Sequence, residues 1–138
     1  MVIFIDTSSL LKRYISEAGS SVVDDYFIDD NDICISPITE IEIHAALNRK
    51  LRDGDIDYGT MQKALKLWHS DYSVLSKIIF SEKLSGSSIQ LIDTHGIKTL
   101  DAIQIGSAII SDSEEFVTSD RQMFKVFQAI DIGKCTFI

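Results

Sequence analysis

The sequence has few of the residues that mark disulfide-rich or disordered chains. Its 138 residues include one proline and only two cysteines, Cys34 and Cys135, which do not form a CxxC pair. A disulfide scaffold is therefore excluded, and both thiols are expected to be reduced and buried. The hydrophobic fraction of 45% excludes a disordered chain. We expect a single domain over residues 1–138, because this length is too short for two ordinary domains.

Long hydrophobic runs are also missing. No stretch approaches the ~18 apolar residues that are needed to cross a bilayer. The apolar N-terminal run is interrupted at Asp6 and has no basic segment before it, which excludes a signal peptide. These absences predict a cytoplasmic protein without a membrane-spanning segment.

Positive charge is scarce as well. There are 13 Lys and Arg against 21 Asp and Glu, a formal net charge of -8. This balance argues against a protein that grips nucleic acid through a large basic surface. The chain also lacks a Walker A loop, a GxGxxG motif and any Ser-His-Asp or Cys-His arrangement. The histidines His44, His69 and His95 have no paired spacing and are expected at the surface or in packing contacts.

Apolar runs that suit buried strands alternate with stretches of helical periodicity, which indicates an α/β fold with a mainly parallel sheet. Strands are expected at Val2–Ile5, Ile33–Ser36, Lys77–Phe80, Phe116–Thr118 and Cys135–Phe137. Helices are expected at Ser8–Glu17, Ser20–Ile28, Pro37–Leu51, Tyr58–Ser73, Thr99–Ile110 and Asp120–Ala129. A further helix is expected to begin at Ser81 or Glu82 and to end near His95.

Two acidic residues follow predicted strands directly. Asp6 ends the first strand, and Asp120 follows the FVTS run and opens a helix. Ligand sites in parallel sheets form beyond the carboxyl ends of the strands, so both carboxylates are candidates for a site. Capping of the next helix is the alternative role for each, and for Asp120 taken alone it is the better supported one.

A third acidic residue, Glu42, is distinguished from its neighbour Glu40 by helical geometry. At 100° per residue, Ile38, Ile41, Ala45 and Ala46 define an apolar arc. Glu42 falls inside this arc, while Glu40 lies on the far side. A carboxylate on a core-facing arc is unfavourable unless it is neutralised or hydrogen-bonded. This position favours a role for Glu42 in a site.

Asp101 is the only charged residue in the segment TLDAIQIGSAII, which is apolar nearly all round. Such a segment predicts a buried helix, and its small residues Gly106, Ser107 and Ala108 allow close packing against a neighbour. Support of the helix N-terminus is one explanation for Asp101. Participation in a site is favoured, because an N-terminal Asp does not require this much apolar surface around it.

All four carboxylates can point toward one end of the sheet. Carboxylates held ~3–5 Å apart repel one another, and a bound divalent cation removes that repulsion. Ligation by oxygen alone suits Mg²⁺ or Mn²⁺. The chemistry that follows is metal-assisted hydrolysis of a phosphodiester.

These residues resemble a known family. The segments IFIDTSSLLKRY, ISPITEIEIHAALNRKLRDGDI, HGIKTLDAIQIGSAI and FVTSDRQMF occur in the order found in PIN domains, and more narrowly in VapC-type toxins. The resemblance covers nearly the whole chain. It implies a three-layer α/β/α sandwich with a central parallel sheet. It also implies that Asp6, Glu42, Asp101 and Asp120 form an acidic quartet that binds Mg²⁺ or Mn²⁺ and cleaves RNA.

Further roles follow from the same resemblance. Thr118 and Ser119 are expected to orient the last Asp. The expected partners are an RNA substrate, a cognate antitoxin that covers the active site, and a second copy of the chain in a homodimer. The helices Pro37–Leu51 and Tyr58–Ser73 resemble the part of the toxin that forms the antitoxin groove. The candidate phosphate contacts are Lys12, Arg13, Arg49, Arg52 and Arg121, for each of which ordinary surface charge is an equal alternative.

Other function classes remain open at this stage. One is a catalytically silent PIN-like module that binds RNA or protein. Another is a phosphatase of the haloacid dehalogenase type, but that family has a second Asp two residues after the first, where this chain has Ser8. A receiver domain is disfavoured, because no acidic pair accompanies Asp6. With four negative charges assigned to one site, the remaining net charge is -8 + 4 = -4, so the acidic balance does not exclude RNA.

Overall fold

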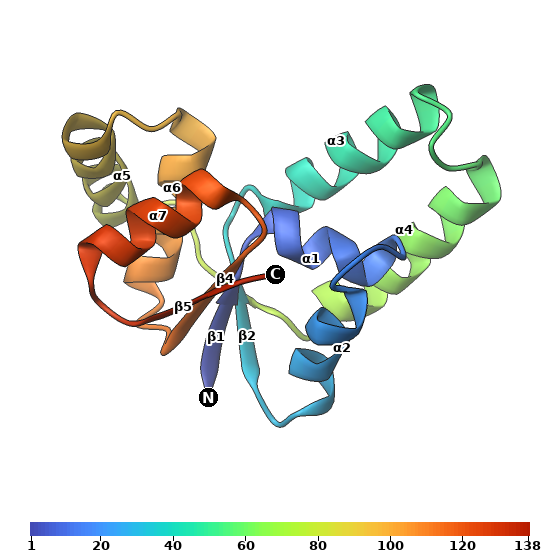
Figure 1. Cartoon of the computed structure of the whole chain (residues 1–138), viewed down its shortest axis with the longest axis horizontal. Helices are drawn as coiled ribbons and strands as arrows, with labels where there is room; N and C mark the ends of the chain where they lie inside the picture. The colour runs from blue at the N-terminus through green and yellow to red at the C-terminus, as the bar shows by residue number, and fades with distance from the viewer.

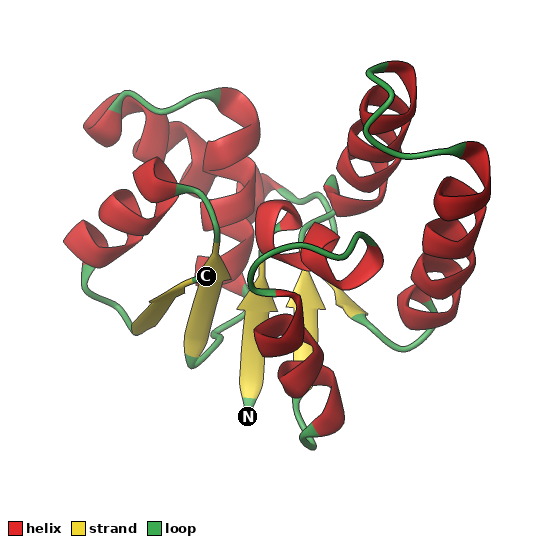
Figure 2. Ribbon diagram, turned by 45° about the vertical axis from the view of Figure 1, so that its right-hand side comes forward, coloured by secondary structure: helices red, strands yellow, loops and turns green.

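A computed structural model describes all residues 1–138 and contains one five-stranded sheet. Every strand pair is parallel, and the strand order is β3-β2-β1-β4-β5. Figure 2 shows the strands pointing the same way across the sheet. The strands are β1 (Val2–Ile5), β2 (Asp32–Ile35), β3 (Ser76–Lys77), β4 (Glu115–Thr118) and β5 (Lys134–Phe137).

Seven helices connect these strands. None of them is both long and apolar enough to span a lipid bilayer. Their bounds are α1 (Thr7–Tyr14), α2 (Ser20–Ile28), α3 (Thr39–Arg52), α4 (Tyr58–Tyr72), α5 (Glu82–His95), α6 (Thr99–Ile110) and α7 (Arg121–Ile130).

The helices form two layers around the sheet, because successive strand side chains point to opposite faces. Ile3 and Ile5 of β1 pack in one core with α1, α3 and α4, where Trp68 is fully buried. Phe4, between them, faces a second core that includes residues of α5, α6 and α7. Figure 1 shows α1 to α4 and α5 to α7 on opposite sides of the strands. The predicted three-layer α/β/α sandwich is confirmed.

The third strand, β3, is shorter than the predicted range Lys77–Phe80 and begins one residue earlier. Only Ser76 and Lys77 pair with β2, and the chain then leaves the sheet. Ile79 and Phe80 are 75% and 60% exposed. An apolar run at the edge of a sheet lacks a second neighbouring strand, so its composition alone does not extend the pairing.

The start and the buried arc of α3 also differ from the expectation. Pro37 and Ile38 form a turn in which the Ile38 N–H donates to the Ser36 hydroxyl, and the helix begins at Thr39. Ile41 is 70% exposed, whereas Ile43 and Leu47 are fully buried. The core-facing arc is therefore centred one residue away from the predicted arc, and Glu42 lies at its margin, half-buried.

Close packing between α5 and α6 depends on a small residue, as the sequence predicts. A Cβ atom added at Gly106 would lie 3.0 Å from the Ser88 hydroxyl and 3.3 Å from Leu84 Cδ1. The predicted free cysteines are also found: Cys34 is buried and Cys135 is half-buried. Burial raises the pKa of each thiol to about 11, which favours the protonated form.

The strand order places a switch point between β1 and β4. From β1 the chain builds one half of the sheet through β2 and β3, and the other half consists of β4 and β5. The connections therefore diverge at the carboxyl ends of β1 and β4, which leaves a crevice there in sheets of this kind. Asp6 follows β1 directly, and Asp120 lies two residues after β4.

Candidate active site

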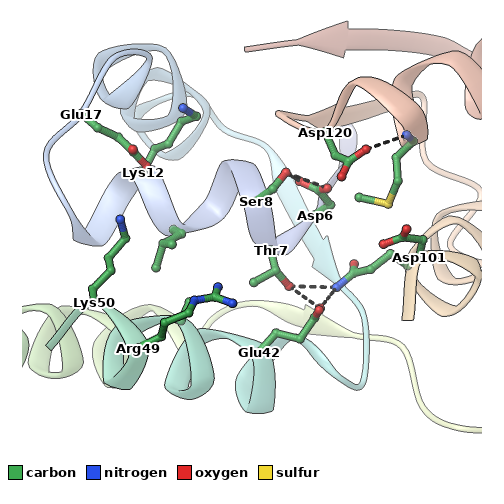
Figure 3. A pocket seen from close by; sticks show the side chains of 14 residues that line it. Asp6, Thr7, Ser8, Lys12, Glu17, Glu42, Arg49, Lys50, Asp101 and Asp120 are labelled. Atoms are coloured by element: carbon green, nitrogen blue, oxygen red, sulfur yellow. Dashed lines mark hydrogen bonds between the residues drawn. The ribbon is translucent and has the colours of Figure 1, made fainter. Parts of the chain in front are cut away.

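The four predicted acidic residues line one cavity at this switch point. Its volume is about 460 Å³. The side chains come from separate parts of the chain: the β1–α1 junction, α3, the first turn of α6 and the β4–α7 loop. Figure 3 shows Asp6, Glu42, Asp101 and Asp120 around the cavity. Parallel strands and the first turns of α3 and α6 thus bring together residues that are far apart in sequence.

Asp6 is fully buried and has both oxygens occupied by protein donors. Its Oδ1 accepts from the Ser9 N–H at 3.0 Å and from the Ser8 hydroxyl at 2.8 Å. Its Oδ2 accepts from the Ser8 hydroxyl at 2.9 Å and from the Thr118 hydroxyl at 2.7 Å. Asp6 is therefore the N-cap of α1, which confirms the capping role, and it also lines the cavity, where a catalytic role stays a prediction.

The charge state of Asp6 is balanced between burial and these donors. Burial raises the pKa of the carboxyl, and the nearby charge of Asp120 acts in the same direction. The hydrogen bonds from Ser9, Thr118 and Ser8 favour the ionised form and oppose this rise. The result is a pKa of about 6 for Asp6.

Asp120 is the N-cap of α7. Its Oδ1 accepts from the Met123 N–H at 2.9 Å, while no protein donor reaches Oδ2. Its own N–H donates to the Thr118 hydroxyl at 3.0 Å, and that hydroxyl also holds Asp6. Thr118 therefore contacts both Asp120 and Asp6, whereas Ser119, the other residue expected to orient Asp120, hydrogen-bonds to Ser8 and Ser9.

Glu42 is held by one of its two oxygens. Its Oε1 accepts from the Thr7 hydroxyl at 2.8 Å and from the Gln104 amide at 2.6 Å. The same amide also donates to the Thr7 hydroxyl, at 2.8 Å. This closed set of hydrogen bonds, drawn in Figure 3, leaves Oε2 of Glu42 without a protein donor.

Asp101 has no protein hydrogen bond, unlike the other three. It lies in the first turn of α6, but the N-cap of this helix is Lys98, which makes no side-chain capping bond. Burial raises the pKa of Asp101, and the negative charges of Asp120 and Glu42 raise it further. The positive charge of Lys98 acts in the opposite direction, and a bound cation would likewise favour the ionised form of Asp101.

The chemistry of this donor set fits a hard divalent cation. Its free oxygens belong to carboxylates, and the mutual effect on the pKa of Asp101 shows that the acids interact. As they stand, no three Asp, Glu, His or Cys side chains of the chain converge closely enough to hold an ion. The four acids therefore line the cavity as separate groups. No histidine lines it; His44 and His69 instead lie with ring centroids 6.2 Å apart between α3 and α4.

Positive side chains occupy another part of the cavity wall. Lys12 of α1 and Arg49 and Lys50 of α3 line it together with Glu17 (Figure 3). The Lys12 ammonium donates to the Ala18 carbonyl at 2.9 Å. Neither Arg49 nor Lys50 forms an ion pair, although acidic residues outnumber basic ones in the chain. They are therefore free to meet an anionic group.

The other predicted phosphate contacts do not line the cavity. The Arg13 guanidinium is bound to Asp71 at 2.6 Å and to Asp24 at 2.9 Å, and it lies 3.9 Å from the centroid of the Phe27 ring. It joins α1 to α2 and α4 and is not available to a ligand. Arg121 lies over the Phe137 ring at 5.1 Å.

Sequence reasoning missed the polar residues that hold the acids. Thr7, Ser8 and Gln104 all line the cavity. Gln104 is 2% exposed, although it is a polar residue in an otherwise apolar helix. The available signal was its position three residues after Asp101, because residues at this spacing share one helix face.

Comparison with known proteins identifies the family and the fold. A family model described as "PIN domain" matches residues 3–129. No curated protein sequence matches the chain at a significant level. Among solved structures, a chain from VapBC2 of Rickettsia felis, bound to a DNA fragment from its promoter, is similar with a TM-score of 0.70 and 19% identity. The match covers 100% of this chain and 99% of that one.

Two further structures have the same fold. PAE2754 from Pyrobaculum aerophilum has a TM-score of 0.70 and 18% identity, over 94% of this chain and 92% of that one. VapC20 from Mycobacterium tuberculosis, a sarcin–ricin loop cleaving toxin, has a TM-score of 0.67 and 15% identity, over 88% of this chain and 92% of that one. The family model spans nearly the whole chain, and the chain belongs to the PIN domain family.

Proposed function

We propose that this chain is a divalent-metal-dependent endoribonuclease and the toxin of a toxin–antitoxin pair. The observation that carries the proposal is the set of four carboxylates lining one cavity at the switch point of the sheet. Membership of the PIN family and the likeness to VapC structures support it. No Ser-His arrangement offers a competing chemistry, because no histidine lines the cavity.

Asp6, Glu42, Asp101 and Asp120 would hold Mg²⁺ or Mn²⁺. The ion supplies an activated water and stabilises charge on the phosphate and the leaving oxygen. The protein's contribution is to fix the carboxylates: Asp6 by four hydrogen bonds, Asp120 by the α7 backbone, and Glu42 by Thr7 and Gln104. Asp101, which has no protein donor, is the carboxylate with both oxygens free.

Two positively charged side chains without ion-pair partners could bind the RNA substrate. Arg49 and Lys50 lie on the α3 side of the cavity. An RNA strand carries one charge on each phosphate, so a phosphate next to the scissile one would meet these side chains while the acids hold the ion. This arrangement accommodates RNA on a protein whose net charge is -8.

The proposed partners are inferred from the similar solved structures and from the exposed surface of this chain. The similar structures include toxin–antitoxin complexes from Rickettsia felis and Klebsiella pneumoniae. In this chain α3 and α4 form a hairpin that extends from the sheet (Figure 1), and Ile41 and Tyr58 on it are 70% and 64% exposed. We infer that an antitoxin covers this hairpin and the cavity beside it, that the toxin forms a homodimer, and that both act in the cytoplasm.

The decisive experiment uses Asp101→Asn. Asp6 and Asp120 cap helices, so their substitution also affects folding, whereas Asp101 caps nothing and has no protein hydrogen bond. We expect wild type to cleave RNA with Mg²⁺ or Mn²⁺ and to be silent in EDTA, and Asp101→Asn to lose at least 100-fold in rate, in line with the removal of a transition-state stabilising charge. Asp93→Asn, an exposed acid on α5, is the matched control. Cleavage without metal, or full activity of Asp101→Asn, would refute the proposal.

A second candidate function is a silent PIN-like module that binds RNA or protein. The observation that favours it is that no three acids converge to coordinating distance. Calorimetry separates the two: binding of RNA without binding of Mn²⁺ would support the module, and saturable Mn²⁺ binding that Asp101→Asn weakens would support the nuclease.

A further inference from the structure

Gln104 is a buried amide that lines the carboxylate cavity. It is 2% exposed, and its Nε2 donates to Glu42 Oε1 at 2.6 Å and to the Thr7 hydroxyl at 2.8 Å. These bonds fix which end of the amide faces Glu42, because only the NH₂ group can donate to a carboxylate. The Gln104 carbonyl oxygen must therefore lie on the other side of the amide.

The Gln104 carbonyl oxygen has no partner. Oε1 is buried, and no protein donor reaches it. Buried polar atoms in native proteins are nearly always hydrogen-bonded, so an orphaned acceptor needs an explanation. The NH₂ end of the amide also contacts the Thr39 hydroxyl at 3.5 Å, and the carboxylates that share the cavity offer no donor when ionised. A water molecule bound to a cation in this cavity would supply the missing donor to Oε1.

We propose, building on the proposed function, that Gln104 is a positioning residue of the cation site. Its NH₂ group holds Glu42 by one oxygen and leaves Oε2 free for the cation. Its Oε1 accepts a hydrogen bond from a water molecule of the hydrated ion. One side chain thus orients a ligand and receives the ion's water, and the orphaned acceptor is satisfied when the ion binds.

A purely structural role does not account for the same facts. The rest of the α6 sequence between Ala102 and Ile110 is apolar or small, so an apolar side chain would fill this position without an unpaired oxygen. Ser107 on the same helix illustrates an ordinary buried polar residue, because its hydroxyl donates to the Ile103 carbonyl at 2.7 Å, within its own helix.

The experiment measures Mn²⁺ binding in the absence of RNA, by calorimetry and by electron paramagnetic resonance. Gln104→Met keeps the approximate size of the side chain but removes both the donor and the acceptor. We expect Mn²⁺ affinity to fall 10- to 100-fold, as for other partners that orient metal ligands. The rise in melting temperature on adding Mn²⁺ should shrink accordingly. Ser107→Ala is the control and should bind Mn²⁺ like wild type.

Further measurements separate an effect of Gln104 on folding from an effect on the position of Glu42. Melting curves in EDTA report the folded state without the ion, and Gln104→Asn, which has the same groups on a shorter side chain, serves if the Met variant does not fold. A cycle with Glu42→Gln tests whether Gln104 acts through Glu42: the losses in Mn²⁺ affinity should then be less than additive. Additive losses would contradict this coupling.

The outcomes also distinguish the two proposals. Absence of Mn²⁺ binding by wild type would overturn the cation site itself, and the role of Gln104 with it. Wild-type binding together with unchanged affinity in Gln104→Met would overturn the role of Gln104 alone and leave the proposed nuclease standing.

Discussion

The Thr118 hydroxyl donates a hydrogen bond to the Asp6 carboxylate at 2.7 Å, although 112 positions separate the two residues in the chain. The same hydroxyl accepts from the Asp120 N–H at 3.0 Å. Thr118 and Asp6 are both fully buried. Thr118 therefore couples the ends of β1 and β4, and it connects the fold of the sheet directly to the arrangement of the acids.

Replacement of Thr118 by Val should destabilise the protein in a pH-dependent way. Val has nearly the same shape but no hydroxyl, so the buried Asp6 carboxylate loses a donor. We expect a loss of about 1–3 kcal/mol at pH 7.5, the range for a buried polar group left unsatisfied. The loss should be smaller at pH 4.5, where Asp6, with a pKa of about 6, is protonated and neutral. Urea unfolding in EDTA at the two pH values measures both.

Thr94→Val on α5 is the matched control, because Thr94 is exposed. Its stability should change little and equally at both pH values. An equal loss at both pH values in Thr118→Val would contradict a role in holding the charged form of Asp6.

The sequence predicts the acids through local signals. Asp6 and Asp120 follow strands, and such positions meet at one edge of a parallel sheet whatever the details of packing. Asp101 is visible as the only charge in an apolar helix. These features depend on the periodicity of one element and on parallel pairing, so they can be read without knowing which helix packs where.

Other features depend on tertiary contacts and escape sequence reasoning. Glu42 lines the cavity, but the predicted apolar arc of its helix includes Ile41, which is 70% exposed. Periodicity cannot tell an apolar side chain that faces the core from one left at the surface. The role of Gln104 also depends on contacts, since Thr7 and Glu42 are 97 and 62 positions away in the chain.

Arg13→Lys should reduce stability without changing cleavage by the folded protein. The Arg13 guanidinium makes two hydrogen bonds to Asp71, at 2.6 Å and 3.2 Å, and Asp71 is 7% exposed. Lys keeps the charge but cannot make this paired contact. We expect a loss of about 1–3 kcal/mol in unfolding free energy, because a buried carboxylate loses a donor. Chemical denaturation measures it, and a large fall in turnover per folded molecule would indicate a role in catalysis instead.

Arg49→Gln should weaken RNA binding without reducing stability. Arg49 lines the cavity, is exposed and forms no ion pair, so its loss should leave the fold intact. As a phosphate contact, it should contribute about 0.7 to the slope of log affinity against log salt for single-stranded RNA. Binding titrations at several salt concentrations, in a background of Asp101→Asn to prevent cleavage, measure this slope.

Arg52→Gln provides the comparison, since Arg52 is exposed at the end of the same helix but does not line the cavity. Its slope should match that of the parent protein. If both substitutions lower the slope equally, the contribution comes from the general charge of α3 and not from the cavity.

Asp6→Asn should stabilise the metal-free protein while abolishing activity. The Asp6 carboxyl has a pKa of about 6 in the folded protein, against 3.8 for an unperturbed Asp in the unfolded chain. The folded state therefore binds more protons than the unfolded state between these pH values. This group therefore makes the fold less stable as pH rises from 4 to 6. The difference between the two pKa values corresponds to about 3 kcal/mol at neutral pH. Asn retains an acceptor for the Ser9 N–H and is a good N-cap, but it carries no charge.

The measurement is unfolding in EDTA across pH 4 to 8, where the advantage of Asp6→Asn should grow with pH up to about 7. Asp57→Asn is the control with the opposite sign: Asp57 also caps a helix, but the hydrogen bond from the Thr60 N–H lowers its pKa, so its ionised form favours the fold. On addition of Mn²⁺, wild type should gain stability and Asp6→Asn should not. An Asp6→Asn variant that is less stable than wild type at pH 7.5 would mean that the capping contacts of the carboxylate outweigh the unfavourable burial of its charge.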